Sequence, residues 1–587
     1  MFLNVSTYLM RRLFLLPLLL LASHAAEPDF PLTADSQPQA SVPKGELITG
    51  SYTVRDGSVF PGTVRDYQIY LPAGLDKTQP AAFMVFQDGV IYQAPVVFDN
   101  LIAKKDIPPL IGIFIKPGIV PAANENALPR FNRSYEYDSI TPTYSDFLID
   151  EFLPAIESKH SLKLSTDPNH AAISGNSSGG ICAFMVAWHR PDRFRRVFTG
   201  VGTYVGIHGA DQLPVLVRKF EPKPLRIFLQ SGTGDNNLYC GDWWMANQMM
   251  ERSLTWAGYD VNHAWGEGGH NAKHATQIFP EVLRWLWRDW QTTMEIKANP
   301  KGESKWKGYE VVGAGEWEVI QQKTSYASLI VANSRGDVVW LEEDTKRNRN
   351  SLIRQSLGSP PKEFTNLPES LFNLSDIAFG KDDCLYVLCS VKAEKDTVLK
   401  IDPNGNSQTL PFMGKDTLAV AFDSVLRIAA TGGIASPWPS EHHLPGLSTY
   451  GGSITFSPDQ TTVYQNVAQG QRVIAWQYRN DGSLDHRQDY GELECDLDGS
   501  SRTQSLCVDT NGWLYVATAL GIQVLDQAGR VNFILPTPKP ALDVCFGGKD
   551  LSDLFIACGD TIYKRPTKAK GVVSGQQPPI KPPAPKL

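Results

Sequence analysis

The sequence has little of what marks nucleic-acid-binding, metal-binding or disulfide-rich proteins. Its 55 basic and 62 acidic residues leave a net charge of −7, so there is no basic excess to neutralise a phosphate backbone. Eight cysteines among 587 residues are too few for a disulfide scaffold, and none forms a Cys-x-x-Cys pair of the kind that binds zinc. We therefore expect no nucleic-acid partner, no metal and no cofactor, and the oligomeric state stays open.

Long apolar runs are also scarce, and the one that stands out is at the N-terminus. Arg11 and Arg12 precede the apolar run 13–22, and small residues follow at 23–25. A run of about ten residues is half of the ~20 that cross a bilayer. This layout is typical of a secretory signal peptide, with a membrane anchor as the alternative. The sequence predicts a signal peptide over 1–25, a polar leader over 26–46, export to the periplasm or the outside of the cell, and no stable membrane span.

The remaining chain has two regions with different patterns of predicted strands and helices. From 47 to 293, short apolar strands alternate with helix-length segments, which is typical of a doubly wound, mostly parallel sheet. From 300 to 566, an apolar strand, a turn with Asp or Gly and a second strand recur. The later copies begin at 375, 418, 453, 505 and 543, so they are 43, 35, 52 and 38 residues apart.

Four-stranded propeller blades repeat every ~40–50 residues. We therefore predict an all-β six-bladed propeller over 300–566, with a β-sandwich as the alternative. Residues 567–587 are rich in proline and are expected to form a disordered tail.

The strongest chemical signal is a Gly-x-Ser-x-Gly pattern at 175–179. It follows the apolar strand 170–174 and precedes a helix-like segment, which is the strand–turn–helix context of a nucleophile elbow. In this interpretation Ser177 is the nucleophile, and the N–H of Ser178 at the helix start is one donor to the oxyanion. The first domain is therefore predicted to be an α/β-hydrolase.

A serine nucleophile needs a histidine base held by a carboxylate. His270 lies on a glycine-rich loop late in the domain, where it can reach over the sheet edge, whereas His274 is expected at a helix start. Asp235 follows the strand 225–230 and is the preferred acid, with Asp242 as the alternative because it can cap the next helix. The order Ser, Asp, His is that of α/β-hydrolases.

Three motifs in this order, AISGNSSGGICAF, SGTGD and GEGGH, resemble the Putative esterase family, which includes esterase D, enterochelin, feruloyl and acetyl-xylan esterases. The resemblance covers about 47–290. It implies that a second oxyanion N–H comes from the run 85–90, where we assign Gly89, although Gln87-Asp88 stands in place of the family's His-containing pair. It also implies an internal, structural Arg–Glu pair within 132–137.

Aromatic residues near these motifs are candidates for a substrate pocket or for core. The candidates for substrate binding are Tyr92, Trp243 and Trp244, with Tyr135 and Tyr204 nearby.

The second half contains ITFSPDQTTVY and LCVDTNGWLYVA, which resemble the gluconolactonase and regucalcin family. That family holds a divalent cation with a Glu, an Asn and an Asp at the central channel. The positions that correspond to the Asn and the Asp here are Gly452 and Gln504, which are poor ligands for a hard cation. The resemblance therefore implies the propeller fold and argues for a metal-free binding or docking module, with a relocated metal site as the alternative.

Together these features predict an exported serine carboxylic-ester hydrolase. Its expected substrates are carbohydrate-linked acetyl or feruloyl esters or related small-molecule esters, and the propeller would bind or dock. The alternatives are a metal-dependent lactonase on the propeller, or a carbohydrate- or protein-binding propeller fused to an inactive hydrolase.

Overall fold

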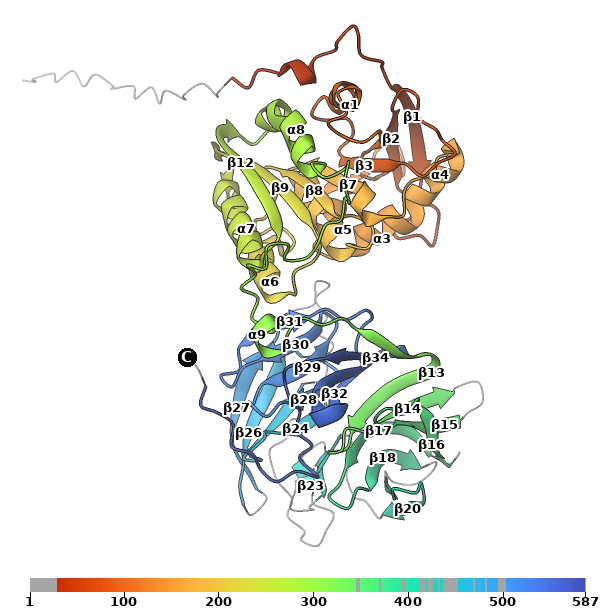
Figure 1. Cartoon of the computed structure of the whole chain (residues 1–587), viewed down its shortest axis with the longest axis vertical. Coiled ribbons are helices and arrows are strands. Elements are labelled where there is room, and N and C mark those ends of the chain that lie inside the picture. The colour runs from red at the N-terminus through yellow and green to blue at the C-terminus, as the bar shows by residue number, and fades with distance from the viewer. Residues whose placement is uncertain are drawn as a thin grey trace, which may run out of the picture.

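The structure is a computed structural model in which an α/β domain and an all-β domain lie end to end (Figure 1). It describes residues 29–344, 349–368, 371–391, 397–410, 417–420, 426–430, 433–435, 452–467, 470–480, 483–494 and 503–585. The predicted signal peptide lies outside this set. Among the helices of the described ranges, none is both long and apolar enough to cross a membrane.

The first domain is built on one ten-stranded sheet. Its order is β12-β9-β8-β7-β3-β4-β2-β5-β6, with β1 paired to β2. The neighbouring pairs from β12 to β4 are parallel and the remaining pairs are antiparallel, so the expected mostly parallel sheet is confirmed. The strands are β1 (Glu46–Thr53), β2 (Val64–Leu71), β3 (Ala82–Gln87), β4 (Leu110–Ile115), β5 (Ile119–Val120), β6 (Arg130–Phe131), β7 (Ala171–Asn176), β8 (Arg196–Gly200), β9 (Arg226–Gly234) and β12 (Asp260–Gly269).

Helices cover both faces of this sheet because its central strands are apolar on both sides. Within β3, Phe83 and Val85 pack into the core that contains α4, α5 and α6, while Met84 and Phe86 pack into the core that contains α1 and α8. This is the layering expected of buried parallel strands. The helices of this domain are α1 (Ala94–Ala103), α2 (Arg133–Tyr137), α3 (Thr143–Asp146), α4 (Leu153–His160), α5 (Ser178–His189), α6 (Leu213–Lys219), α7 (Trp243–Ala257) and α8 (Lys273–Leu286), with a π-helical turn at Phe147–Phe152, while α9 (Gly308–Val311) packs on β31 of the second domain.

The segment before β1 is held against the first domain. It carries a short 3₁₀ turn, Ala34–Ser36, whose Asp35 forms ion pairs with Arg284 of α8 (2.7 Å) and with Lys104. Phe30 stacks on the ring of His274 at 4.8 Å. The described part of the predicted leader therefore packs on α8.

The second domain is made of antiparallel strands. Those described form the sheets β16-β15-β14-β13-β34-β33-β32, β17–β20, β21–β23, β24–β27 and β28–β31. Their bounds are β13 (Glu318–Ala332), β14 (Val338–Asp344), β15 (Arg349–Gln355), β16 (Lys362–Asn366), β17 (Leu371–Phe379), β18 (Leu385–Val391), β19 (Thr397–Ile401), β20 (Ser407–Leu410), β21 (Thr417–Val420), β22 (Leu426–Ala430), β23 (Gly433–Ala435), β24 (Ile454–Phe456), β25 (Thr462–Asn466), β26 (Arg472–Tyr478), β27 (Leu484–Glu492), β28 (Leu506–Val508), β29 (Leu514–Thr518), β30 (Gly521–Leu525), β31 (Val531–Leu535), β32 (Asp543–Gly547), β33 (Asp553–Ala557) and β34 (Gly559–Pro566).

The first strands of these sheets contact one another in sequence order. β13 contacts β17, and contacts continue through β21, β24 and β28 to β32, which contacts β13. The long strand β13 pairs with β34 through its first residues and with β14 through its last. The second domain is therefore largely β, as expected, and its closure into six blades stays a prediction.

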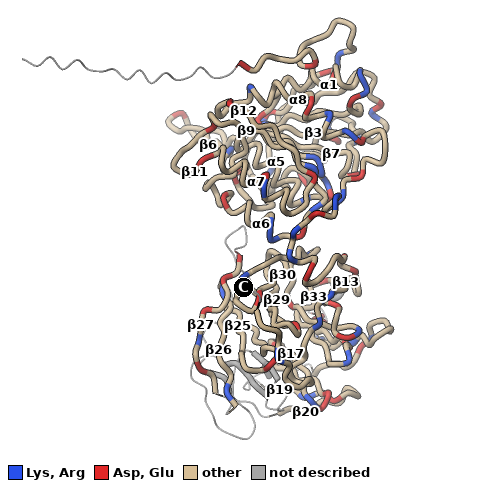
Figure 2. Tube along the Cα trace, turned by 60° about the vertical axis from the view of Figure 1, so that its left-hand side comes forward, with Lys and Arg blue, Asp and Glu red and all other residues tan. Residues whose placement is uncertain are grey.

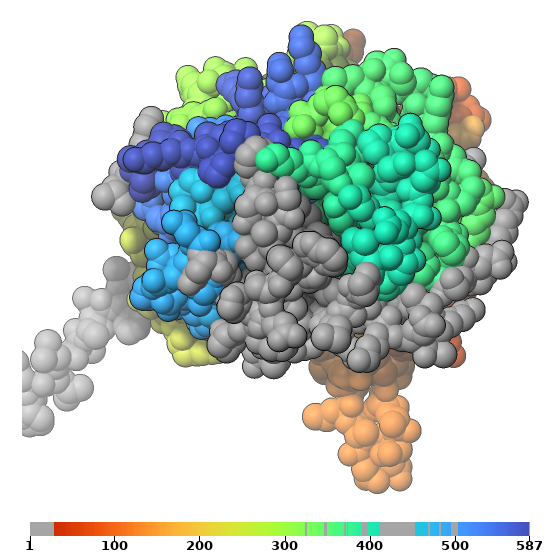
Figure 3. All heavy atoms as spheres, turned by 90° about the horizontal axis from the view of Figure 1, so that it is seen from below, coloured from red at the N-terminus to blue at the C-terminus, as the bar shows by residue number. Residues whose placement is uncertain are grey.

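The expectation of a disordered C-terminal tail is wrong for residues 567–585. Figure 3 shows this end of the chain, in dark blue, running over the surface of the β domain. The N–H of Val572 donates to the Val508 carbonyl (3.3 Å), and that of Ile580 donates to the Pro458 carbonyl (2.8 Å). The side chain of Gln576 donates to the Gly380 carbonyl at 3.1 Å. Composition identified a segment without a core of its own, but its hydrogen-bond partners lie at or just after the ends of strands that are distant in the sequence.

The two domains meet where α6 leads into β9. Phe220 forms a parallel bridge with Ile534 of β31, and the Glu221 carboxylate accepts two hydrogen bonds of 2.7 Å from Arg565 of β34. Lys219 pairs with Glu494 nearby. Figure 2 shows acidic and basic residues on both sides of this junction beside α6.

Candidate active site

Ser177 lies on a sharp turn between β7 and α5. Its φ of 59° and ψ of −121° are outside the regions that side-chain-bearing residues favour, which is typical of a nucleophile elbow. The glycines of the motif are required by close packing. A Cβ at Gly175 would lie 2.2 Å from the Gly179 carbonyl oxygen, and one at Gly179 would lie 3.0 Å from the Asp88 carboxylate. The motif therefore builds the turn that its sequence context predicted.

The serine, histidine and aspartate selected from the sequence lie in one hydrogen-bonded line. His270 Nε2 is 2.7 Å from Ser177 Oγ, and His270 Nδ1 is 2.6 Å from Asp235 Oδ1. The Asp235 side chain is fully buried, while one fifth of the His270 side chain is exposed. Ser231 Oγ donates to the other Asp235 oxygen at 2.7 Å. Three segments that are far apart in the chain therefore converge at the carboxyl ends of β7, β9 and β12.

The two alternatives weighed for these roles lie elsewhere. Asp242 is the N-cap of α7, where its carboxylate accepts the N–H of Met245 at 3.0 Å. His274 lies on α8, where its ring stacks on Phe30 and its Nδ1 is 3.2 Å from Gln230 Nε2. Burial lowers the pKa of His274. Both residues have local structural contacts that account for their positions.

The three aromatic candidates have different surroundings. The indole of Trp243 packs edge-on against the His270 ring at 5.5 Å, and its Nε1 donates to Thr203 Oγ1, which is 3.4 Å from Ser177 Oγ. Trp243 is 4% exposed, so it packs behind His270 as a buried neighbour of the triad. Trp244 packs against Trp265 at 5.4 Å.

Tyr92 does not line an open pocket, in contrast to the expectation. Its ring is 3% exposed and packs on Phe198 and Phe279. Its hydroxyl donates to the carbonyl of Gly175 at 3.1 Å. Tyr92 is therefore part of the core next to α8, and its hydroxyl supports the backbone of the turn that carries the nucleophile.

The two predicted oxyanion donors also differ. Ser178 is the first residue of α5, where backbone N–H groups have no intrahelical acceptor. The N–H of Gly89, however, donates to the Ile115 carbonyl of the adjacent strand at 3.2 Å. The assignment of Gly89 as a donor is therefore wrong in this structure, because its N–H continues the pairing of β3 with β4.

The predicted internal Arg–Glu pair of 132–137 is also wrong. Glu136 is buried and pairs with Arg65 at 2.8 Å, whereas Arg133 pairs with Asp88 at 2.7 Å. The two residues pair with different strands, because Glu136 is buried next to Arg65 of β2 and Arg133 reaches Asp88 after β3. Sequence reasoning thus missed Arg133 and Asp88, whose pairing across 45 residues leaves no local signal.

Several large apolar side chains are exposed on segments that follow the strands of this edge. The β10 (Asn237–Leu238) and β11 (Gly241–Asp242) hairpin lies between Asp235 and Trp243 in the chain. On it, Leu238 is 53% exposed and Tyr239 is 97% exposed.

Comparison with known proteins agrees with the geometry. Residues 58–286 match the family model described as "Putative esterase". Residues 445–559 match the model described as "SMP-30/Gluconolactonase/LRE-like region". The iron(III) enterobactin esterase of Dickeya dadantii (strain 3937) is 30% identical over 152 residues, which are 23% of this chain and 33% of that protein. The match thus spans about a third of this curated relative.

Solved structures resemble each half of the chain. The enterobactin esterase of Shigella flexneri has a TM-score of 0.34 at 20% identity, over 44% of this chain and 63% of that one. A protein described as a "putative gluconolactonase" has a TM-score of 0.38 at 14% identity, over 45% of this chain and 97% of that one.

The β domain has a central cavity whose lining tests the divalent-cation site implied by the second family. Gly452 and Gln504 line a volume of about 330 Å³ together with Asp376 and Asp543. A Cβ at Gly452 would lie 2.1 Å from the Asn466 carbonyl oxygen, so the backbone has no room for a ligand side chain there.

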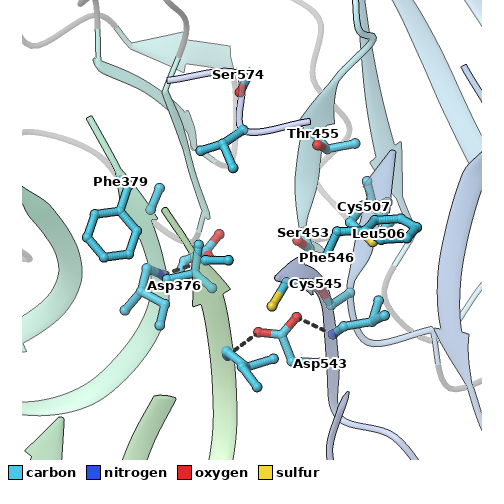
Figure 4. Close-up of a pocket in the computed structure, with 18 of the residues that line it drawn as sticks. Asp376, Phe379, Ser453, Thr455, Leu506, Cys507, Asp543, Cys545, Phe546 and Ser574 are labelled. Atoms are coloured by element: carbon cyan, nitrogen blue, oxygen red, sulfur yellow. Dashed lines mark hydrogen bonds between the residues drawn. The ribbon is translucent and has the colours of Figure 1, made fainter. Parts of the chain in front are cut away.

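Asp376 and Asp543 also line a second cavity of the β domain, which Figure 4 shows, and there they lie on opposite sides, with Asp543 held by the backbone. The Asp543 carboxylate accepts the N–H groups of Ile330 and Val544, both at 2.7 Å. Within the described ranges, no three His, Cys, Asp or Glu side chains gather as a ligand group. The residues present do not fit the ligand set of that family, and no step through a metal is derived.

Proposed function

We propose that the α/β domain is a serine esterase with Ser177, His270 and Asp235 as its catalytic residues. The match to the esterase family supports ester hydrolysis. The observation that carries the mechanism is the continuous line of hydrogen bonds from Ser177 Oγ through His270 to the buried Asp235.

In this mechanism His270 Nε2 takes the Ser177 proton as Oγ attacks the ester carbonyl carbon. The Ser178 N–H stabilises the oxyanion of the tetrahedral intermediate. When the intermediate collapses, the C–O bond to the alcohol breaks, and His270 donates its proton to that alcohol. Water, deprotonated by His270, then hydrolyses the acyl-enzyme. The Asp235 carboxylate accepts the hydrogen bond from His270 Nδ1–H throughout and stabilises the imidazolium.

For the substrate we propose an ester with an aromatic acyl group, such as a feruloylated carbohydrate, in preference to a small acetyl ester. The support is the large exposed side chains of Leu238 and Tyr239 on the hairpin that follows Asp235. Aromatic side chains bury large area against a ring, whereas an acetyl group offers little to contact. We also propose export, on the layout of residues 1–25.

We propose that the β domain is a six-bladed propeller that serves as a binding module for a carbohydrate or a protein. The ring of contacts from β13 to β32 supports closure. The second candidate function is a lactonase on this domain, favoured by the match at 445–559. The crowding at Gly452 counts against it.

The test uses the purified full chain and its Ser177→Ala variant on feruloylated and acetylated sugars and on a lactone, with and without EDTA. We expect a serine-reactive phosphonate to label Ser177, and ester hydrolysis to be lost in the variant and kept in EDTA. Full ester hydrolysis by Ser177→Ala would overturn the proposal. Lactone hydrolysis that EDTA abolishes would instead establish the second candidate.

A further inference from the structure

The side chain of Arg133 joins three segments around the nucleophile. Its Nε and Nη2 donate to the two oxygens of Asp88 at 2.7 and 2.9 Å, which is a bidentate pair. Its Nη1 donates to Ser178 Oγ at 3.0 Å. Arg133 begins α2, Asp88 follows β3, and Ser178 begins α5, so one guanidinium fixes the positions of all three segments.

The carboxylate that Arg133 holds is close to the place where negative charge develops. Asp88 Oδ2 would lie 3.0 Å from a Cβ at Gly179, which is in the first turn of α5 beside the proposed oxyanion donor. Asp88 itself has a φ of 67°, in the left-handed region that side-chain-bearing residues seldom adopt. The carboxylate is therefore held beside the start of α5 by its two hydrogen bonds to Arg133.

We propose, on the basis of the esterase function proposed above, that Arg133 is a positioning residue that neutralises Asp88 and holds the loop after β3 against the start of α5. A bare carboxylate at this distance from the first turn of α5 would repel the oxyanion of the tetrahedral intermediate. With Arg133 in place, the field beside the oxyanion is close to neutral, and the Ser178 amide stays aimed at it. The bond between Arg133 and Ser178 also restrains the residue that carries that amide.

The charge state of the pair suits this role. The hydrogen bonds with Asp88 raise the pKa of Arg133 above its ordinary value, so the guanidinium stays charged at every pH at which the enzyme folds. The side chain is 39% exposed, so the charge is partly screened, but its guanidinium donates four hydrogen bonds, two to Asp88, one to Ser178 and one to the Asn176 carbonyl. Most of the donors of Arg133 are thus engaged in holding the site.

The test is a double-mutant cycle on the full chain, with Arg133→Gln, Asp88→Asn and the pair together. Removing Arg133 leaves Asp88 charged, and we expect kcat to fall roughly 10²-fold with KM changed less than about threefold, which is the size of effect found for single oxyanion contacts. The double variant has no carboxylate to repel the oxyanion, so it should recover at least about tenfold in kcat over Arg133→Gln. Arg133→Lys, which keeps the charge and loses the fork, should lie between.

The matched control is Arg130→Gln, which removes the same charge from an exposed residue three positions earlier. Rates are expressed per active site titrated with a phosphonate, and thermal unfolding is followed for every variant. Unchanged kcat in Arg133→Gln, or an equal loss in the single and double variants, would overturn the proposal. If Ser177→Ala kept full activity the esterase function would fail instead, so the two failures are distinguishable.

Discussion

At the scale of single residues, the identity of the acid illustrates how contacts separate chemically equal candidates. Asp235 and Asp242 are both aspartates after β9, but the former is fully buried against His270 and the latter caps α7. A carboxylate that is buried and aimed at Nδ1 can hold one tautomer of the imidazole. A cap satisfies a backbone N–H and does no more.

Asp235→Asn should therefore lower kcat by about 10³- to 10⁴-fold with little change in KM, because the imidazole loses its oriented tautomer. Asp242→Asn should leave kcat within about twofold and change the free energy of unfolding by less than about 1 kcal/mol. Steady-state kinetics on an aryl ester and thermal unfolding check both variants. A larger kinetic loss in Asp242→Asn than in Asp235→Asn would contradict the assignment.

A second residue-scale prediction concerns pH. Burial raises the pKa of Asp543 from 3.8 to about 6. The folded state therefore binds this proton more tightly than the unfolded state, so the stabilisation is complete below pH ~4 and is lost as the pH rises through about 6. The rise is equivalent to at most about 3 kcal/mol.

Asp543→Asn cannot ionise, so its free energy of unfolding relative to the unmodified protein should rise by about 1–3 kcal/mol between pH 4 and pH 7.5. Denaturant unfolding at the two pH values measures this change. An unchanged difference would show that Asp543 titrates as an exposed carboxyl does.

At the scale of elements, sequence periodicity and local motifs predicted what local chemistry determines. The strand–turn–helix around Ser177 and the positions of Asp235 and His270 follow from glycine placement and chain order. The pairs Arg133–Asp88 and Gly89–Ile115 could not be predicted, because each depends on which strand lies next in the sheet. The order of the C-terminal segment was missed for the same reason, since its partners are loops that are distant in the sequence.

The β10–β11 hairpin gives a prediction at this scale. Tyr239 is almost fully exposed at its tip, so Tyr239→Ala should leave the free energy of unfolding within about 0.5 kcal/mol. If the hairpin contacts an aromatic acyl group, KM for a feruloyl ester should rise about three- to tenfold, with an acetyl ester unaffected. Equal effects on both esters would show that the hairpin does not select the acyl group.

At the scale of the whole molecule, the C-terminal segment ties distant parts of the β domain together. Residues 567–585 donate to or accept from the loops beside β17, β24, β28 and β32. Each such bond is worth about 1 kcal/mol, and the segment also adds burial around Ala569.

Ending the chain after Pro566 should therefore lower the unfolding temperature of the β domain by several degrees while kcat on a small ester stays within about twofold. Calorimetry and ester kinetics on the same sample measure both quantities. A large loss of kcat would mean that the segment acts on the esterase site, and an unchanged melting profile would mean that its bonds add no net stability.

The junction between the domains has a consequence for how a large substrate is handled. Phe220, which joins β31, packs on Trp188 near the last turn of α5, whereas the nucleophile precedes the first turn of that helix. Eleven helical steps lead from Ser177 to Trp188, a rise of about 16 Å along the helix. The described part of the β domain therefore contacts the α/β domain near the end of α5 that lies away from the nucleophile. A polymer gripped by the β domain would have to loop back around the molecule to present its own ester, so anchoring would mainly raise the local supply of esters from neighbouring chains.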